Sequence, residues 1–215
     1  MQHFILKSLG LFLGIYLLLF SLVTWGNGKD FMRNTYQKSI EMVYSNFGNG
    51  GEVVLKPLRN QKHYDLEFVM TSKQQKNKAL DKARKQGLKK TKITPIKFPL
   101  NSWTTSSMFF IFLFALILAT PIRWKEKVLS FLIAFSILVL FVLFKTGFSV
   151  LLKFSTYYER FEVGFANETI IYLLNYLHNI IIYPYFGLLV VVLIWFFTCF
   201  SKIQFSEKNV IAKSI

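Results

Sequence analysis

Long apolar runs alternate with polar segments along the chain, and the runs have the length of membrane-crossing helices. Four of them are predicted as spans, over residues 4–25, 103–122, 128–152 and within 168–200. A helix rises ~1.5 Å per residue, so ~20 residues are needed to cross a ~30 Å hydrocarbon core. The pattern predicts an α-helical integral membrane protein with about four transmembrane helices.

The first and last apolar runs each raise a question of their own. Residues 9–25 exceed the ~7–15 residues of a signal-peptide core and no A-x-A-like site follows, so we expect an uncleaved span. Residues 168–200 are too long for one upright span, and Pro184 breaks the helical pattern. Two arrangements stay open: an interfacial helix over 168–183 followed by a short span over 184–200, or one strongly tilted helix.

The polar segment at residues 26–102 is predicted to fold as a small α+β domain inserted between the first and second spans. Its hydrophobic period changes from helical to alternating and back. The expected order is helix, strand, strand, helix, strand, over residues 29–47, 52–58, 63–72, 73–87 and 89–100. The residues expected to face inward are Phe31, Tyr36, Ile40, Val43, Tyr44 and Phe47 on the first helix and Tyr64, Leu66, Phe68 and Met70 on the second strand.

These elements divide the chain into five predicted segments. They are transmembrane helix 1 (1–25), a basic α+β extracytoplasmic domain (26–102), a transmembrane hairpin (103–152), an extracytoplasmic loop with an interfacial amphipathic helix (153–183), and transmembrane helix 4 with a cytoplasmic tail (184–215).

Composition and charge agree with a membrane location and predict an orientation. The 215-residue chain is 53% hydrophobic with a formal net charge of +15. One lysine lies near the N-terminus and three lie in the C-terminal tail. The short turn after the second span carries Arg123, Trp124, Lys125 and Lys127, which form a topology anchor. The positive-inside rule then places both termini in the cytoplasm of a bacterial inner-membrane protein. Segment 26–102 is also basic, with 16 Lys and Arg against 6 Asp and Glu, but loops longer than ~60 residues translocate regardless of charge.

Residues 73–97 form the most basic block, with ten Lys and Arg and one acid. The block is expected either to be a solvated helix face or to contact anionic lipid, a lipid-linked polymer or a protein. No aromatic residues interleave with the cations, so no nucleic acid is expected as a partner. The candidate contact residues are Lys82, Arg84, Lys85, Lys89 and Lys90.

A second candidate surface lies on the helix predicted from residue 168. Glu168, Tyr172, Asn175 and Asn179 recur at steps of four, three and four, so they share one face, and His178 lies at its edge. Polar residues at membrane depth are functional candidates. Three interpretations stay open: a face turned to water, a partner-binding face, or a catalytic site.

The cysteine and histidine residues of the sequence show no pattern that predicts a cofactor or a metal site. Cys199 is the single cysteine, so it forms no intrachain disulfide and is expected to face lipid or the protein core. His3, His63 and His178 lie in separate regions without ligand spacing. Lys145 is expected to extend toward lipid head groups.

The hairpin at residues 101–141 carries a family resemblance. It begins with the polar letters "NSW", ends its first apolar run with "LATP", and continues through "RWK" into a second run. This arrangement resembles small multi-span membrane proteins that accompany exosortase and archaeosortase systems. The sortase-like enzymes of those systems use Cys, Arg and His, which this chain does not match. The resemblance implies an associated membrane subunit and transfers no catalytic residue.

We therefore expect a non-enzymatic accessory or scaffold subunit of a bacterial cell-envelope export, sorting or assembly system. Its expected partners are membrane lipids and another membrane or envelope protein, bound through the extracytoplasmic domain. The alternative is a membrane-embedded enzyme or carrier acting on lipid-linked substrates, with ionisable groups at Glu159, Glu162, Glu168 and His178.

Overall fold

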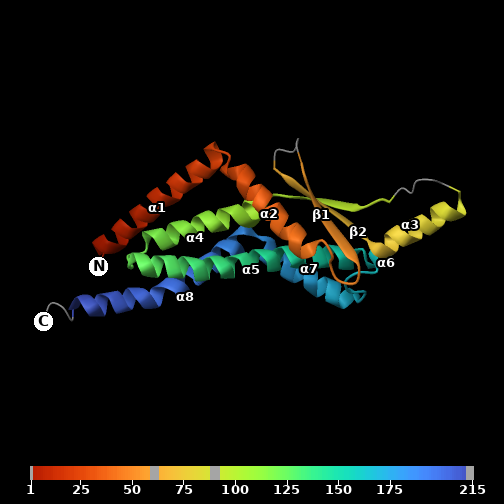
Figure 1. The fold of residues 1–215 in the computed structure, drawn as a ribbon. Coiled ribbons are helices and arrows are strands. Elements are labelled where there is room, and N and C mark those ends of the chain that lie inside the picture. Colours follow the sequence, from red (N-terminus) through yellow and green to blue (C-terminus); the bar gives the residue numbers. More distant parts are fainter. Residues whose placement is uncertain (1, 59–62, 88–92, 212–215) are drawn as a thin grey trace. The chain divides into compact units, whose positions relative to one another are not determined.

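The computed structural model describes residues 2–58, 63–87 and 93–211, with side chains placed between 8 and 199 (Figure 1). The described chain is mostly helical and includes a small three-stranded sheet. It divides into two compact units. We call residues 1–32, 103–142 and 183–215 the helical unit, and residues 33–102 and 143–182 the sheet unit.

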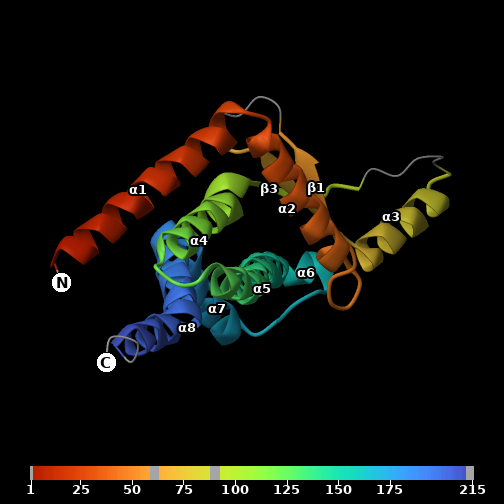
Figure 2. The ribbon, with the colours of Figure 1, turned by 60° about the vertical axis from the view of Figure 1, so that its left-hand side comes forward.

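The helical unit holds the long apolar helices. They are α1 (Gln2–Trp25), η1 (Trp103–Ser107, a π-helical turn) continuing into α4 (Met108–Ala119), the first part of α5 (Trp124–Thr156), and α8 (Pro184–Ile211) (Figures 1 and 2). Among the described residues, α1 and α5 are long and apolar enough to cross a membrane. The predicted membrane character is therefore supported by two helices.

The other two predicted spans differ from simple crossings. The helix over Trp103–Ala119 is a shorter apolar helix that ends three residues before the predicted end at residue 122. The reason is Pro121, because a residue before proline is disfavoured in helical conformation, and Thr120 is extended with ψ of 129°. At ~1.5 Å per residue its 17 residues cover ~26 Å, slightly less than a hydrocarbon core.

The last apolar segment forms two helices, as the first of the two predicted arrangements requires. Helix α7 (Glu168–Ile182) belongs to the sheet unit and α8 to the helical unit, with a break at Tyr183 directly before Pro184. Counted together as one broken span, they would be a third membrane crossing. The single tilted helix is excluded.

Aromatic side chains hold the helical unit together. Phe12 of α1 meets Phe112 of α4 edge to face, with ring centroids 5.4 Å apart, and Phe20 meets Trp103 at 5.5 Å. Such pairs add stabilisation beyond the area they bury. Within a bilayer, where lipid tails remove the hydrophobic drive for association, this kind of close packing is what holds helices together.

The sheet unit confirms the predicted order of elements. Helix α2 (Gly28–Tyr44), whose first five residues belong to the helical unit, is followed by β1 (Gly51–Pro57), β2 (Leu66–Ser72), α3 (Lys73–Lys85) and β3 (Ile96–Leu100). The strands form an antiparallel sheet in the order β1-β2-β3. Alternation along β2 buries Leu66, Phe68 and Met70 completely, as expected of a half-buried strand.

Several residues expected to face inward do not. Tyr64 precedes β2 and is 43% exposed, and Phe31 and Val43 on α2 are also exposed. Only Tyr36 and Ile40 of α2 are buried, because the apolar face of this helix is narrower than its hydrophobic spacing indicates. Gln37 and Glu41, one residue after Tyr36 and Ile40, contact β1 instead.

Two polar side chains of α2 cover the outer edge of β1. Gln37 Nε2 donates to the Leu55 carbonyl oxygen at 3.1 Å, and the Leu55 N–H donates to Glu41 Oε1 at 3.3 Å. An uncovered edge strand would present unpaired backbone groups for association with another chain. These two side chains pair the backbone of Leu55 and thereby protect the edge at this point.

Candidate functional site

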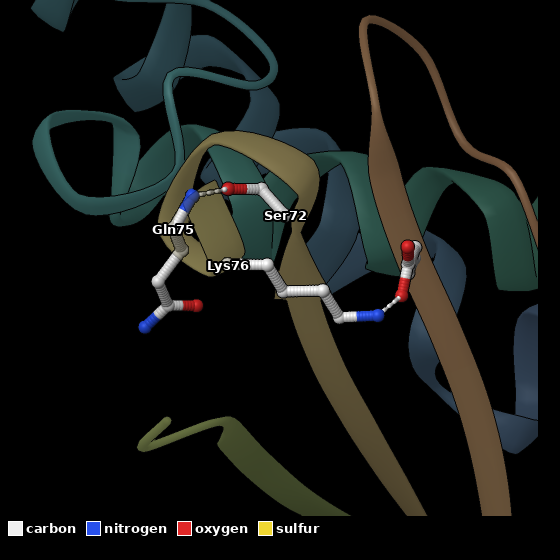
Figure 3. Close-up of polar contacts among 4 residues, drawn as sticks. Ser72, Gln75 and Lys76 are labelled. Atoms are coloured by element: carbon white, nitrogen blue, oxygen red, sulfur yellow. Dashed lines mark hydrogen bonds and ion pairs between the residues drawn. The ribbon is translucent and has the colours of Figure 1, made fainter. Parts of the chain in front are cut away.

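The basic helix α3 is fixed to the sheet at its N-terminal half. Ser72 caps it by accepting a hydrogen bond from the Gln75 N–H at 3.1 Å, and Lys76 pairs with Glu52 of β1 (Figure 3). Two residues further along, Lys78 pairs with Glu162 from the segment after α5. The cap and the two ion pairs hold the N-terminal half of α3 in place within the sheet unit.

The four remaining cations of α3, which project on several sides of the helix, are together called the basic surface. It consists of the exposed side chains of Lys73, Lys82, Arg84 and Lys85. In the described part of the chain none of the four makes an ion pair. The sequence-predicted Lys82, Arg84 and Lys85 therefore lie together on one short helix, whereas Lys89 and Lys90 lie outside the described residues.

Residues 157–167 have structural roles that the sequence did not indicate. Arg160 donates to the Thr94 carbonyl oxygen, and Glu162 adopts a left-handed conformation with φ of 54° beside its pair with Lys78. Glu162 and Arg160 thus tie the loop to α3 and to the stretch before β3. Glu159, on the short helix α6 (Tyr158–Phe161), is exposed.

The structure separates the predicted polar stripe of α7 into two parts. Glu168, Tyr172, Asn175 and Asn179 are exposed. His178 instead faces α5, where its Nε2 lies 3.1 Å from Ser149 Oγ and its ring stacks on Phe148 with centroids 6.4 Å apart. The stripe and His178 are therefore not one site, because the imidazole is partly enclosed against another helix whereas the four stripe residues are exposed.

A buried polar cluster on α5 was missed by the sequence reasoning. Lys145 and Thr146 are each 2% exposed, and Tyr36 Oη lies 2.9 Å from Thr146 Oγ1. Lys145 also has an interaction within the chain, so its expected extension to lipid head groups is wrong. Burial raises the pKa of Tyr36 above its ordinary value, so the phenol stays neutral. The signal in the sequence was the polar pair at 145–146 inside an apolar run.

Close approach of α2 to α5 at this cluster depends on a glycine. Tyr44 Oη donates to the Leu143 carbonyl oxygen at 2.7 Å, and its ring lies directly over Gly147. A Cβ at Gly147 would be 2.8 Å from Tyr44 Cζ. The absence of a side chain at residue 147 is therefore what admits the tyrosine ring.

The predicted topology anchor is a structured turn. Arg123, Trp124 and Lys125 are exposed, whereas Lys127 Nζ donates to the Leu118 carbonyl oxygen at 2.6 Å and so caps the end of α4. Trp195 of α8 donates from Nε1 to Thr120 Oγ1 at 2.7 Å, and the buried Ser130 Oγ donates to the Thr198 carbonyl oxygen at 3.1 Å. Cys199, beside that bond, is fully buried and faces the protein core.

Within the residues that the structure describes, no group of three or more His, Cys, Asp or Glu side chains could hold a metal ion. Comparisons with known protein families, curated proteins and solved structures found no match. The geometry of the chain itself is therefore what bears on its function. That geometry offers a fixed basic surface on α3, a partly enclosed histidine on α7 and a buried lysine on α5.

Proposed function

We propose that this chain is a non-enzymatic inner-membrane accessory protein that holds an envelope partner through the basic surface of α3. The observation that carries the proposal is the contrast within α3. Lys76 and Lys78 are tethered to Glu52 and Glu162, whereas the basic surface is exposed and forms no ion pair among the described residues. The exposed cations of α3, with Asp81 as the one acid of the helix, give it a net positive charge that can steer and orient a partner of opposite charge.

The membrane arrangement belongs to the same proposal. Four crossings with both termini in the cytoplasm would place segment 26–102 outside, and the resemblance of the 101–141 hairpin to exosortase-associated subunits agrees with an accessory role. The turn supports this orientation, because Arg123 and Lys125 remain exposed for cytoplasmic head groups while Lys127 caps α4.

Orientation is tested with a cysteine at Leu80, which is 47% exposed on α3. The native Cys199 is fully buried and gives little background. A membrane-impermeant maleimide should label Leu80→Cys in intact cells after opening of the outer membrane. Labelling only after the inner membrane is broken would place α3 in the cytoplasm and overturn the proposed topology.

Partner binding is tested by neutralising the basic surface. The triple variant K82Q/R84Q/K85Q should lose the proteins that co-purify with the wild type in mild detergent, by about tenfold if the three cations together supply ~1.4 kcal/mol. The matched control K38Q/K56Q changes two exposed lysines on α2 and β1 and should retain them. Equal recovery of co-purifying proteins from the wild type and the triple variant, at equal protein levels, would contradict the proposal.

The second candidate function is an enzyme or carrier acting on lipid-linked substrates. The burial of Lys145 and the contact of His178 with Ser149 favour it, because ionisable groups within membrane helices often serve function. Alanine at His178 and at Glu168 separates the candidates. Variants that lose function in cells at normal protein level would support the enzyme or carrier. Variants that behave like the wild type would support the accessory role.

A further inference from the structure

The helical unit contains an apolar pocket of about 250 Å³ between α1, α4 and α5. Its walls include Leu19 and Val23 of α1, Met32 of α2, Phe110 and Phe114 of α4, and Phe131 of α5. On the aromatic side the rings pack in pairs, Phe110 with Phe135 at 5.2 Å and Phe114 with Phe131 at 5.1 Å between centroids. An apolar cavity of ~150 Å³ already binds an organic molecule the size of benzene, so this pocket has room for a longer hydrocarbon.

The pocket lies at a level of the membrane that the sequence marks with tryptophans. Leu19 and Val23 are in the last two turns of α1, which ends at Trp25, and Trp25 is 91% exposed. Trp103, at the start of η1, packs against Phe20 one residue beyond Leu19. Tryptophan is enriched where hydrocarbon meets head groups. The pocket therefore lies in the hydrocarbon next to one interface, within reach of a lipid tail.

A cation lies one helical turn from the pocket wall. Lys29 is three residues before Met32 on α2, so the two side chains share a face of the helix. Lys29 is exposed and forms no ion pair in the described ranges, whereas Asp30 already has an interaction within the chain. An apolar pocket with a neighbouring cation at the interface matches an amphiphile that has one apolar tail and a negative head.

We propose that this pocket binds one fatty-acyl chain of an anionic phospholipid, with the lipid phosphate at Lys29. The inference uses the membrane location of the chain but not the basic surface of α3, so either can fail alone. The lipid would fill the space between α1 and the α4–α5 hairpin and act as a bound structural ligand. A second copy of the chain or a neutral lipid would satisfy only the apolar part of the site.

The full-length protein in phosphatidylcholine vesicles tests this, with phosphatidylglycerol carrying a photoreactive diazirine on its acyl chain as the probe. After irradiation, label should concentrate on peptides containing Leu19–Val23 and Phe110–Phe114. Val23→Phe fills the pocket and should lower that label at least about fivefold, whereas Leu22→Phe changes the neighbouring 64%-exposed side chain and should not. Leu19→Phe is the second pocket-filling variant in case Val23→Phe folds poorly.

Competition with unlabelled lipids tests the charge. Excess phosphatidylglycerol should displace the probe about fivefold better than phosphatidylcholine, and Lys29→Gln should remove that preference while Lys38→Gln keeps it. Equal competition by the two lipids in the wild type would overturn the head-group assignment. Label spread evenly over the exposed face of α1, or equal label in Val23→Phe and Leu22→Phe, would overturn the pocket.

Discussion

Gly147→Ala should destabilise the protein although alanine is the better helix former. In a helix interior, glycine to alanine normally stabilises by ~1 kcal/mol. Here the new Cβ would be 2.8 Å from Tyr44 Cζ and 2.9 Å from Cε1, so the ring has to move. Overpacking costs ~1–3 kcal/mol, and the bond from Tyr44 Oη to the Leu143 carbonyl contributes ~0.5–1.5 kcal/mol.

The net expectation is a loss of about 2 kcal/mol, which lowers Tm by about 4–8 °C for a chain of this size. The measurement is thermal unfolding of the detergent-solubilised protein, followed by size-exclusion chromatography of the soluble fraction. Gly14→Ala is the matched control, because nothing lies within 4 Å of a Cβ at that position. It should leave Tm unchanged or raise it.

A double-mutant cycle separates the clash from other effects of residue 147. Once Tyr44→Ala has removed the ring, Gly147→Ala has no ring to meet and should be neutral or stabilising. The coupling between the two positions is then about 2–3 kcal/mol. If Gly147→Ala lowers Tm equally with and without the Tyr44 ring, the packing argument at this glycine is refuted.

Three further outcomes are expected. Gly187→Ala should lower Tm because a Cβ would be 2.8 Å from Phe109 Cε2, and Phe109→Ala should relieve this; an unchanged Tm in Gly187→Ala would contradict the close packing of α8 on α4. Trp195→Phe removes the donor to Thr120 Oγ1 and should lower Tm by about 2–4 °C without affecting partner recovery, so a stable variant would mean that the bond contributes nothing. Burial raises the pKa of Tyr36 above 10.0, the ordinary value of a tyrosine. The buried phenol therefore contributes fully to stability below pH 10, and this contribution is lost as the pH rises further and the unfolded chain ionises. Chemical denaturation on both sides of pH 10 should show a smaller loss in Tyr36→Phe, and equal losses would disprove the assignment.

Much of the sheet unit could be predicted from the sequence because its signals are local. The alternation of Leu66, Phe68 and Met70 identifies β2, and Ser72 before a polar helical run identifies the start of α3. The break before Pro184 likewise follows from the chemistry of one residue. In each case the determining interaction spans only a few residues.

The candidate sites depend on contacts that no local pattern contains. Lys78 and Glu162 are 84 positions apart, and their pairing makes Glu162, an ionisable group of the alternative enzyme or carrier interpretation, a tether for α3. The four residues of the α7 stripe are exposed, whereas His178, which the spacing places at the edge of that face, contacts Ser149 of α5. The partner helix decides which side of an amphipathic helix is covered.

Helix α5 shows why Lys145 in an apolar run was misinterpreted. Successive helical residues are ~100° apart, so burial of Lys145, Thr146 and Gly147 in sequence covers ~200° of the helix circumference. The preceding part of α5 is different, because Leu132 is 57% and Leu140 66% exposed, as expected of a lipid-facing surface. The helix therefore passes from a stretch with one exposed side to a stretch covered on several sides just after Phe144, which is 59% exposed. Lys145 lies just beyond that change, where protein groups can satisfy a charge that hydrocarbon would not.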